Sequence, residues 1–289
     1  MRTIRKSLLH LFLLTFTFSF GLLAQNSTQQ NADEPAQGQS QAEATKPDNN
    51  KLPDNNKPKD PLENWKFRNL GPAAGGGRIT SVVGVPGKPN IYYAGAAAGG
   101  VFMTQDGGLS WKPVFEKEAA ATIGAIAIAP SNPSVVWVGT GEANIRNDVV
   151  TGKGVYVSTD AGSSWRFMGL RDVGQISSIV INPQNPDIVL VGAVGHPWGA
   201  NADRGVFRTT DGGKTWQKVL YINDTTGASS LIMDPGNPMV LFAGLWQLER
   251  HSWMLQSGGK SGGIFRSTDG GSTWKKLTDG LPEGPTGRI

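Results

Sequence analysis

The chain of 289 residues contains no cysteine and only three histidines. Without cysteine, disulfide bonds, thiolate catalysis and cysteine-ligated zinc or iron–sulfur centres are excluded. One histidine falls in an apolar N-terminal stretch, which leaves His196 and His251, too few for an evident histidine metal site. Phosphate-binding loops, dinucleotide fingerprints and nucleophile elbows are missing as well. We therefore expect no metal and no cofactor.

Concentrated charge of one sign is also missing. The formal net charge is only +4, and lysine and arginine never gather in runs longer than pairs. Binding to nucleic-acid phosphates needs a basic patch. We therefore expect no nucleic-acid partner, and the charges are typical of a solvated surface.

Long hydrophobic runs occur once, over residues 8–23, behind Arg2, Arg5 and Lys6 and just before Ala24. This pattern predicts a secretory signal peptide over residues 1–24 and a secreted, periplasmic or cell-envelope location. Leu22 is large for a position three residues before the cut, so an uncleaved membrane anchor is the alternative. Residues 25–61 are rich in Gln, Asn, Asp, Lys and Pro, which predicts a disordered linker.

Glycine is abundant, at 39 residues, and seven of these glycines lie in the four copies of an eight-residue phrase that recurs along the rest of the chain. We call it the Asp phrase: Ser/Thr, any residue, Asp, any residue, Gly, any residue, Ser/Thr, Trp. Its copies span residues 104–111, 158–165, 209–216 and 267–274. Their aspartates and tryptophans are Asp106, Trp111, Asp160, Trp165, Asp211, Trp216, Asp269 and Trp274. Intervals of 54, 51 and 58 residues between aspartates indicate one supersecondary unit per copy.

The Asp phrase predicts a hairpin turn that is closed by an aromatic anchor. The aspartate accepts hydrogen bonds from its own turn, and the glycine supplies a positive φ. A buried indole would contribute about 4–6 kcal/mol before entropy is subtracted. Catalysis or metal binding by the four aspartates would need them to converge, whereas one per repeat spreads them around the molecule.

Each repeat contains four short apolar runs, which predict a four-stranded meander. The first runs are 79–85, 123–128, 176–181 and 228–233, and the second runs are 91–95, 135–139, 188–192 and 239–244. A third run leads into each Asp phrase and a fourth follows it, as 205–208 and 216–220 do. The fold class expected is therefore all-β, a β-propeller of four-stranded antiparallel blades over residues 62–289.

The meander predicts which connections share an end of the propeller. The Asp phrases and the proline turns after the first runs fall at one end, and the connections between second and third strands fall at the other, which we call the loop face. Its loops are expected at 96–98, 142–153, 195–204 and 246–262. The candidate ligand-binding residues are Arg78, Glu142, Asn144, Arg146, Asp148, His196, Trp198, Arg250 and Trp253. The alternative is that these loops pack on one another, with Trp198 and Trp246 as local core.

The last three residues, Gly287, Arg288 and Ile289, repeat Gly77, Arg78 and Ile79, which open the first strand. We therefore expect four blades and the start of a fifth, in a fragment of a larger propeller, because a propeller closes on itself to remove its edges.

The Asp phrases resemble Asp-boxes, also called BNR repeats, which occur in sialidases, sortilin-type receptors, xyloglucanase-type glycoside hydrolases and photosystem II assembly factors. The stretches WKFRNLGPAAGGGRITSVVGVP, YYAGAAAGGVF and VVWVGTGEANIRN are most similar to large secreted bacterial proteins with a sortilin N-terminal-like propeller, often labelled glycosyl hydrolase. The resemblance covers residues 65–289 and implies the fold more specifically than an activity.

The resemblance also exposes a departure. Xyloglucanases carry a catalytic aspartate in a first-blade stretch that aligns with residues 96–100, and Ala97 stands in its place here. Retaining and inverting glycosidases both need two carboxyl groups. The arginine triad and tyrosine nucleophile of sialidases have no identifiable counterpart, Arg78 alone being a weak match.

These observations favour a secreted propeller that binds a protein or a glycan through its loop face. One alternative is a glycoside hydrolase of the xyloglucanase or sialidase type, for which Glu142 and Asp148 are the candidate catalytic residues. The other is an assembly chaperone for an envelope complex. A membrane contact is expected only through an uncleaved N-terminal anchor.

Overall fold

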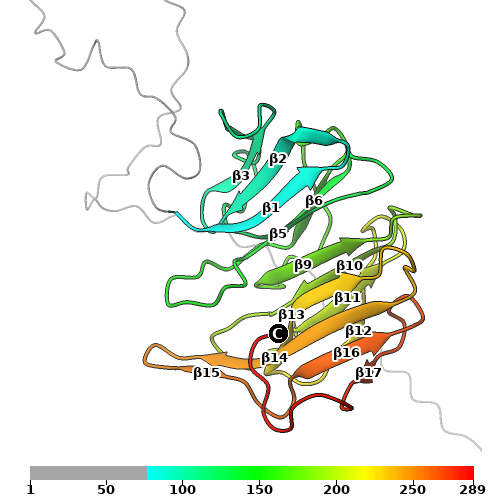
Figure 1. Ribbon diagram of the computed structural model, residues 1–289. Coiled ribbons are helices and arrows are strands. Elements are labelled where there is room, and N and C mark those ends of the chain that lie inside the picture. The colour runs from blue at the N-terminus through cyan, green and yellow to red at the C-terminus, as the bar shows by residue number, and fades with distance from the viewer. Residues whose placement is uncertain (1–76) are drawn as a thin grey trace, which may run out of the picture. The chain divides into compact units, whose positions relative to one another are not determined.

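The computed structural model describes residues 77–289, and the predicted signal peptide, the predicted linker and residues 62–76 lie outside that part. Four separate antiparallel sheets follow one another along the chain (Figure 1). The described residues contain no helix, and therefore none long and apolar enough to cross a membrane. The predicted all-β propeller architecture is confirmed.

Each sheet is a meander in which neighbours in sequence are neighbours in space. The first sheet comprises β1 (Ile79–Val85), β2 (Lys88–Ala96), β3 (Gly100–Thr104) and β4 (Lys112–Pro113), and the second comprises β5 (Ile123–Ile128), β6 (Val136–Thr140), β7 (Val155–Ser158) and β8 (Arg166–Phe167). The third comprises β9 (Ile176–Ile181), β10 (Val189–Ala193), β11 (Gly205–Thr209) and β12 (Gln217–Leu220). The fourth comprises β13 (Thr226–Met233), β14 (Leu241–Arg250), β16 (Gly263–Ser267) and β17 (Lys275–Lys276), and β15 (Leu255–Ser257) pairs with the far end of β14.

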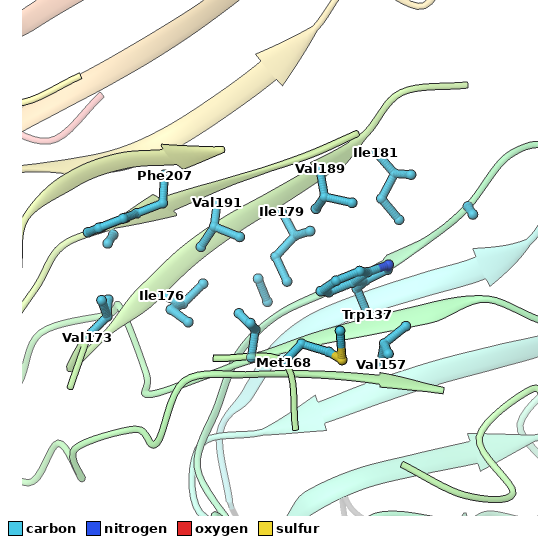
Figure 2. Close-up of a cluster of buried hydrophobic side chains, with 14 residues drawn as sticks. Trp137, Val157, Met168, Val173, Ile176, Ile179, Ile181, Val189, Val191 and Phe207 are labelled. Carbon is cyan, nitrogen blue, oxygen red and sulfur yellow. The ribbon is translucent and has the colours of Figure 1, made fainter. Parts of the chain in front are cut away.

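The apolar runs form strands because neighbouring sheets cover both of their faces. The second strand of the second and third sheets, β6 and β10, is buried along its whole length. Between these sheets Trp137, Met168, Ile176, Val191 and Phe207 share one core cluster (Figure 2). At about 25 cal/mol per Å² of apolar surface, each such side chain stabilises the stack by about 2–3 kcal/mol.

A glycine near the end of each second strand lets the next sheet approach closely. A Cβ on Gly95 would lie 2.5 Å from Cγ2 of Ile123, and one on Gly139 would lie 2.4 Å from Cγ2 of Ile176. Both isoleucines are fully buried and open the first strand of the following sheet. The inner strands therefore pack backbone against side chain.

The end of the described chain repeats this contact. A Cβ on Gly244 would lie 3.1 Å from Cβ of Ile289, and Ser229 Oγ donates to the Ile289 carbonyl at 2.8 Å. Ser177 Oγ makes the equivalent bond to the Ala228 carbonyl, at 2.7 Å, between the third and fourth sheets. Ile289 thus lies against the fourth sheet as the first residue of an inner strand lies against the sheet before it.

Two expected boundaries are wrong. β13 begins at Thr226, two residues before the predicted run, and β14 continues through Trp246 to Arg250. The predicted loop 246–262 is therefore largely a hairpin, β14–β15, which we call the arm. It forms because Leu248, Glu249 and Arg250 pair with residues 255–257, and Leu248 is buried beneath Leu255 and its neighbours.

The Asp phrases adopt the same hydrogen-bonded turn four times. In the third, Asp211 Oδ1 accepts from Thr209 Oγ1 at 2.7 Å and from Thr215 N at 2.9 Å, and Oδ2 accepts from Thr215 Oγ1 at 2.6 Å. These bonds hold the pKa of Asp211 below its usual range, and Ser164 chiefly lowers that of Asp160 to about 2. Ala161 stands in the left-handed region, with φ of 56°, where the other three phrases have glycine.

The tryptophans of the Asp phrases are half-buried, so the expectation of fully buried anchors overstated their burial. Two of them instead tie neighbouring sheets together through the indole N–H. Trp165 Nε1 donates to the Val114 carbonyl at 2.6 Å, and Trp216 Nε1 donates to the Met168 carbonyl at 2.7 Å. Trp274 Nε1 bonds only within its own phrase, to the Gly271 carbonyl at 3.1 Å. The phrase is therefore also an inter-sheet contact.

Candidate functional site

The loop face is built by the connections that follow β2, β6, β10 and β14. Because the strands alternate in direction, these connections and the starts of the first strands share one end, opposite the Asp phrases. The first connection is short, and residues 142–153 form the long second one. All nine candidate binding residues lie on these connections, on the arm or just before a first strand.

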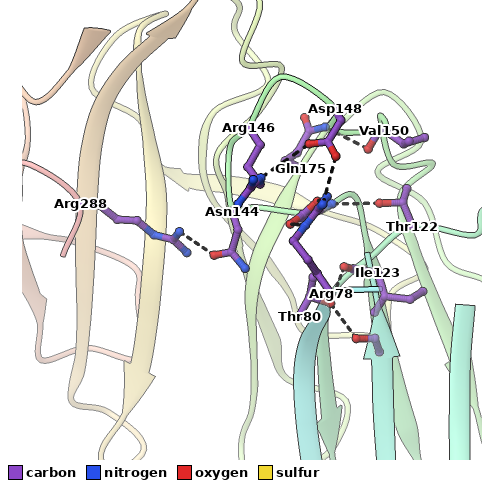
Figure 3. Close-up of polar contacts among 12 residues, drawn as sticks. Arg78, Thr80, Thr122, Ile123, Asn144, Arg146, Asp148, Val150, Gln175 and Arg288 are labelled. Atoms are coloured by element: carbon purple, nitrogen blue, oxygen red, sulfur yellow. Dashed lines mark hydrogen bonds and ion pairs between the residues drawn. The ribbon is translucent and has the colours of Figure 1, made fainter. Parts of the chain in front are cut away.

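Arg78, directly before β1, joins two carboxylates of the second loop (Figure 3). Its Nε donates to Glu142 Oε1 at 2.8 Å, its Nη2 to Glu142 Oε2 at 2.5 Å, and its Nη1 to Asp148 Oδ2 at 3.1 Å. The Glu142 side chain is only 1% exposed, and its backbone N–H donates to Thr122 Oγ1 at 3.1 Å. The three residues form one planar, bidentate network of the kind arginine makes with carboxylates.

The network fixes the charge state of its exposed members. The hydrogen bond to Glu142 is the largest cause that raises the pKa of Arg78 above its usual value. The hydrogen bond from Arg78 holds the pKa of Asp148 below its usual range. Asp148 is therefore ionised at neutral pH, and its side chain is 63% exposed.

The second loop spans from the first sheet to the fourth. Asn144 Oδ1 accepts from Arg288 Nη1 at 2.7 Å (Figure 3). The Arg288 guanidinium lies 5.7 Å from the centre of the Trp246 ring. Ala143 and Ile145 pack in a small cluster with Trp246 and Leu248 of the arm strand. The loop is therefore held at both ends by residues distant in sequence.

Beyond this contact, Arg146, Asn147, Asp148 and Arg250 line a shallow hollow of about 400 Å³. Arg146 Nε lies 3.8 Å from Asp148 Oδ1, at the limit of an ion pair. The Arg250 backbone N–H donates to the Pro197 carbonyl at 2.7 Å, which places the third loop beside the arm. The second loop and the arm thus meet at the hollow, and the third loop lies beside the arm.

The third loop is organised by a buried arginine. Arg204 is fully buried and donates to the carbonyls of His196 at 2.9 Å, Gly199 at 3.1 Å and Thr225 at 3.2 Å. Burial lowers its pKa to about 10. Trp198 lies inside the loop that these bonds close, with 46% of its surface exposed.

Two aromatic side chains mark the tip of the arm. The rings of His251 and Trp253 stack with centroids 5.3 Å apart and an interplanar angle of 17°. His251 Nε2 lies 2.9 Å from Glu249 Oε1. Trp253 is 80% exposed, which is unusual for an aromatic residue that only serves a fold.

The structure brings six candidates together and leaves three at the margin. Arg78, Glu142, Asn144, Arg146, Asp148 and Arg250 form a continuous set. His196 turns to the Asp172 carbonyl, 2.8 Å from its Nε2, and Trp198 and Trp253 stand exposed on neighbouring segments. Mutual packing of the loops accounts for Trp246, which is buried in the local core, but not for Trp198.

Three residues at this face were not among the candidates: Gln175, Arg204 and Arg288. Gln175 is fully buried and donates from Nε2 to the Val150 carbonyl at 3.2 Å. Gln175 and Arg288 precede the first strand of their repeats just as Arg78 does, so the repeat register could have identified them. Arg204 gives no comparable signal, because an arginine that ends a loop usually points into solvent.

The arrangement limits which residues can do hydrolytic chemistry. Both oxygens of Glu142 are occupied by Arg78, and its side chain is buried, so it cannot reach a substrate. Asp148 is accessible, but its lowered pKa makes it a base or nucleophile and not a general acid. Ala97 is buried in the β2–β3 turn, where its N–H bonds to the Arg78 carbonyl at 2.9 Å. Within residues 77–289 no three His, Cys, Asp or Glu side chains gather closely enough to hold a metal ion.

Comparison with known proteins agrees with the fold. The Sortilin-Vps10 family model, described as sortilin, neurotensin receptor 3, matches residues 153–283. Xyloglucanase Xgh74A of Acetivibrio thermocellus is 26% identical over 257 residues, covering 76% of this chain and 28% of that protein. A xyloglucanase of a Paenibacillus species is 25% identical over 253 residues, covering 79% of this chain and 23% of that protein.

Solved structures give the same result. An ancestral GH74 enzyme superposes with a TM-score of 0.55 at 24% identity, covering 72% of this chain and 26% of that one. The GH74 xyloglucanase from Xanthomonas campestris gives 0.52 at 17% identity, covering 72% and 31%. The chain is thus similar to sortilin-like and xyloglucanase-like β-propellers, which confirms the predicted resemblance. It spans about a quarter of the length of the curated relatives that it matches.

Proposed function

We propose that this chain is a segment of an exported Asp-box propeller protein that binds a glycan, or a glycan-bearing protein, through its loop face. The observation that carries the proposal is a charged hollow between the second loop and the arm, on a face that also carries two exposed tryptophans. Rigid sheets hold these loops, as binding sites usually require. The xyloglucanase relatives favour a glycan as the ligand.

Binding rather than turnover is the leading proposal because the available carboxylates do not form an acid and base pair. In the resemblance to xyloglucanases, Ala97 stands at the position of a catalytic aspartate. Both carboxylate oxygens of the buried Glu142 are bonded to Arg78. Hydrolysis needs a proton donor at the leaving group as well as a base or nucleophile. Asp148 supplies at most the second of these.

The test is an affinity comparison of three single variants, using a plant-polysaccharide and glycoprotein array followed by calorimetry on the best ligand. Trp198→Ala and Trp253→Ala are each expected to weaken binding by about 2 kcal/mol, the loss typical of an aromatic anchor. Gln184→Ala, in a proline turn at the opposite end, is the control and is expected to bind as the wild type does. If substitutions at the Asp phrases weakened ligand binding and these two tryptophan variants did not, the proposal would be contradicted.

Glycoside hydrolysis is the second candidate, favoured by the named activity of the relatives. It would use Asp148 together with a carboxyl group outside the network. Release of reducing sugar from xyloglucan by the complete protein, abolished by Asp148→Asn, would establish it. Glu142→Gln is less informative, because it also disturbs the Arg78 network.

A further inference from the structure

The loop face carries more positive than negative charge at its centre. Arg78, Arg146, Arg250 and Arg288 are cationic, and the carboxylates among them are Glu142 and Asp148. Arg78 takes both oxygens of Glu142 and one of Asp148. Within the described residues, the other three arginines make a single contact with a carboxylate, the 3.8 Å contact between Arg146 and Asp148.

Arg250 is the least satisfied of the four. It forms no ion pair with any carboxylate in residues 77–289. Its Nε is buried and has no hydrogen-bond partner within the described part of the chain. The Nε is closed to solvent, so a ligand in the hollow can meet only the outer nitrogens of the Arg250 guanidinium.

The backbone around these groups is fixed before any ligand arrives. Hydrogen bonds donated by Arg78 and by Arg288 hold the second loop, and the bond from Arg250 N to the Pro197 carbonyl holds the arm. Arg146, Arg250 and Asn147 therefore line one hollow in a preformed arrangement, together with Asp148, whose carboxylate is already paired with Arg78. Preorganisation of this kind favours affinity because little freedom is lost on binding.

We infer that this hollow binds the carboxylate of an acidic sugar, so that the ligand of the loop face is a uronic-acid-containing glycan. The inference rests on the proposed function and adds the ligand's chemical class. Arginine forks match the two oxygens of a carboxylate, and the second guanidinium and the Asn147 amide supply further donors. The exposed rings of Trp198 and Trp253 offer flat apolar surfaces for the sugar rings, which favours a glycan over an acidic peptide.

The decisive probe is an oligogalacturonate compared with its fully methyl-esterified form, which keeps the shape and removes the charge. Calorimetry on the wild-type protein should show about tenfold to hundredfold tighter binding of the acid, the ratio expected for hydrogen bonds to a charged group. That preference should shrink as salt is raised. This comparison needs no variant and is therefore independent of folding effects.

Variants then locate the carboxylate. Arg250→Gln and Arg146→Gln should each remove most of the preference for the acid, because the affinity for the acid falls much more than the affinity for the methyl ester. Arg266→Gln is the matched control, because Arg266 is an exposed arginine on β16 beside the Phe242 ring. Melting temperatures of all three variants should agree with the wild type.

Equal binding of acid and ester would overturn the acidic-sugar inference and leave glycan binding intact. Binding of poly-glutamate with higher affinity than the oligogalacturonate would also overturn it, in favour of an acidic peptide. If the protein bound none of these probes and no neutral glycan, both the inference and the proposed function would be contradicted.

Discussion

At the Asp-phrase end each aspartate bonds within its own phrase, whereas at the loop face Arg78 bonds residues 64 and 70 positions away and Arg288 bonds one 144 positions away. The bonds within an Asp phrase depend on eight consecutive residues and therefore recur wherever the phrase recurs. The bonds of Arg78 and Arg288 form only when the sheets have assembled. The Asp-phrase end therefore supports the propeller, whereas the sequence of the loop face can vary.

The largest effect is expected at the Asp-phrase end. Trp216→Ala should lower the free energy of unfolding by about 2–4 kcal/mol, because it opens a cavity beside Trp137 and removes the bond to Met168. Urea titration would measure the loss. Trp274→Ala is the matched control and should cost less, since its indole bonds only within its own phrase. A larger loss for Trp274 would contradict the inter-sheet role.

At the loop face we expect a smaller loss of stability, accompanied by a loss of ligand affinity. Arg204→Met should cost about 2–3 kcal/mol, because three carbonyls each lose a hydrogen bond and the Thr225 carbonyl loses the one that Arg204 donates to it. It should also weaken any ligand that contacts Trp198, since only Asn201 then bonds the carbonyls of His196 and Gly199 in the loop that carries Trp198. Thermal melts and the affinity assay above would separate the two. A variant that melts lower but binds normally would show that this loop is only structural.

Acid should act on the Asp-phrase end. The pKa of Asp160 is lowered in the folded state, to about 2, from an ordinary value near 3.8. A group with a depressed folded pKa stabilises the fold above its unfolded pKa and loses that contribution as pH falls through the folded value. The melting temperature of Asp160→Asn should therefore lie below that of the wild type at pH 5–8, and the gap should close between about pH 4 and pH 2. A gap that is constant down to pH 2 would contradict this.

The smallest effect distinguishes one Asp phrase from the others. Ala161→Gly should stabilise the fold by about 0.5–1 kcal/mol, because alanine is strained at a φ of 56° and glycine is not. Gly212→Ala, at the same position of the third phrase, should destabilise it, since the added Cβ would lie 3.0 Å from Asp187 Oδ1. Differential scanning calorimetry resolves changes of this size. Equal signs for the two substitutions would refute the explanation.

The sequence predicted the fold well because its signals are short-range. The first runs 79–85, 123–128 and 176–181 coincide with β1, β5 and β9, since each combines β-branched residues with a proline turn. The arm was missed because β15 has three residues, and only its pairing with β14 makes it a strand. A loop that is rich in Trp, Arg and His gives no sign of such pairing.

The position of the candidate site could be predicted from the sequence, but the contacts among its residues could not. The meander predicted which loops share one end, and the candidate residues were chosen for their chemistry; their role in binding stays a prediction. That Arg78 would bond both oxygens of Glu142, while Arg250 Nε would find no acceptor among residues 77–289, depends on contacts between distant segments. Composition and spacing carry no information about such contacts.

The glycine near the end of each second strand also links the packing of the sheets to the loop face. Because Gly95 and Gly139 carry no side chain, the backbone of the second strand lies directly against an isoleucine of the following sheet. A Cβ added at Gly139 would lie 2.4 Å from Cγ2 of Ile176, so the third sheet would have to shift relative to the second. The loops carried by these two sheets would then shift relative to one another, although no residue of the loop face had been changed.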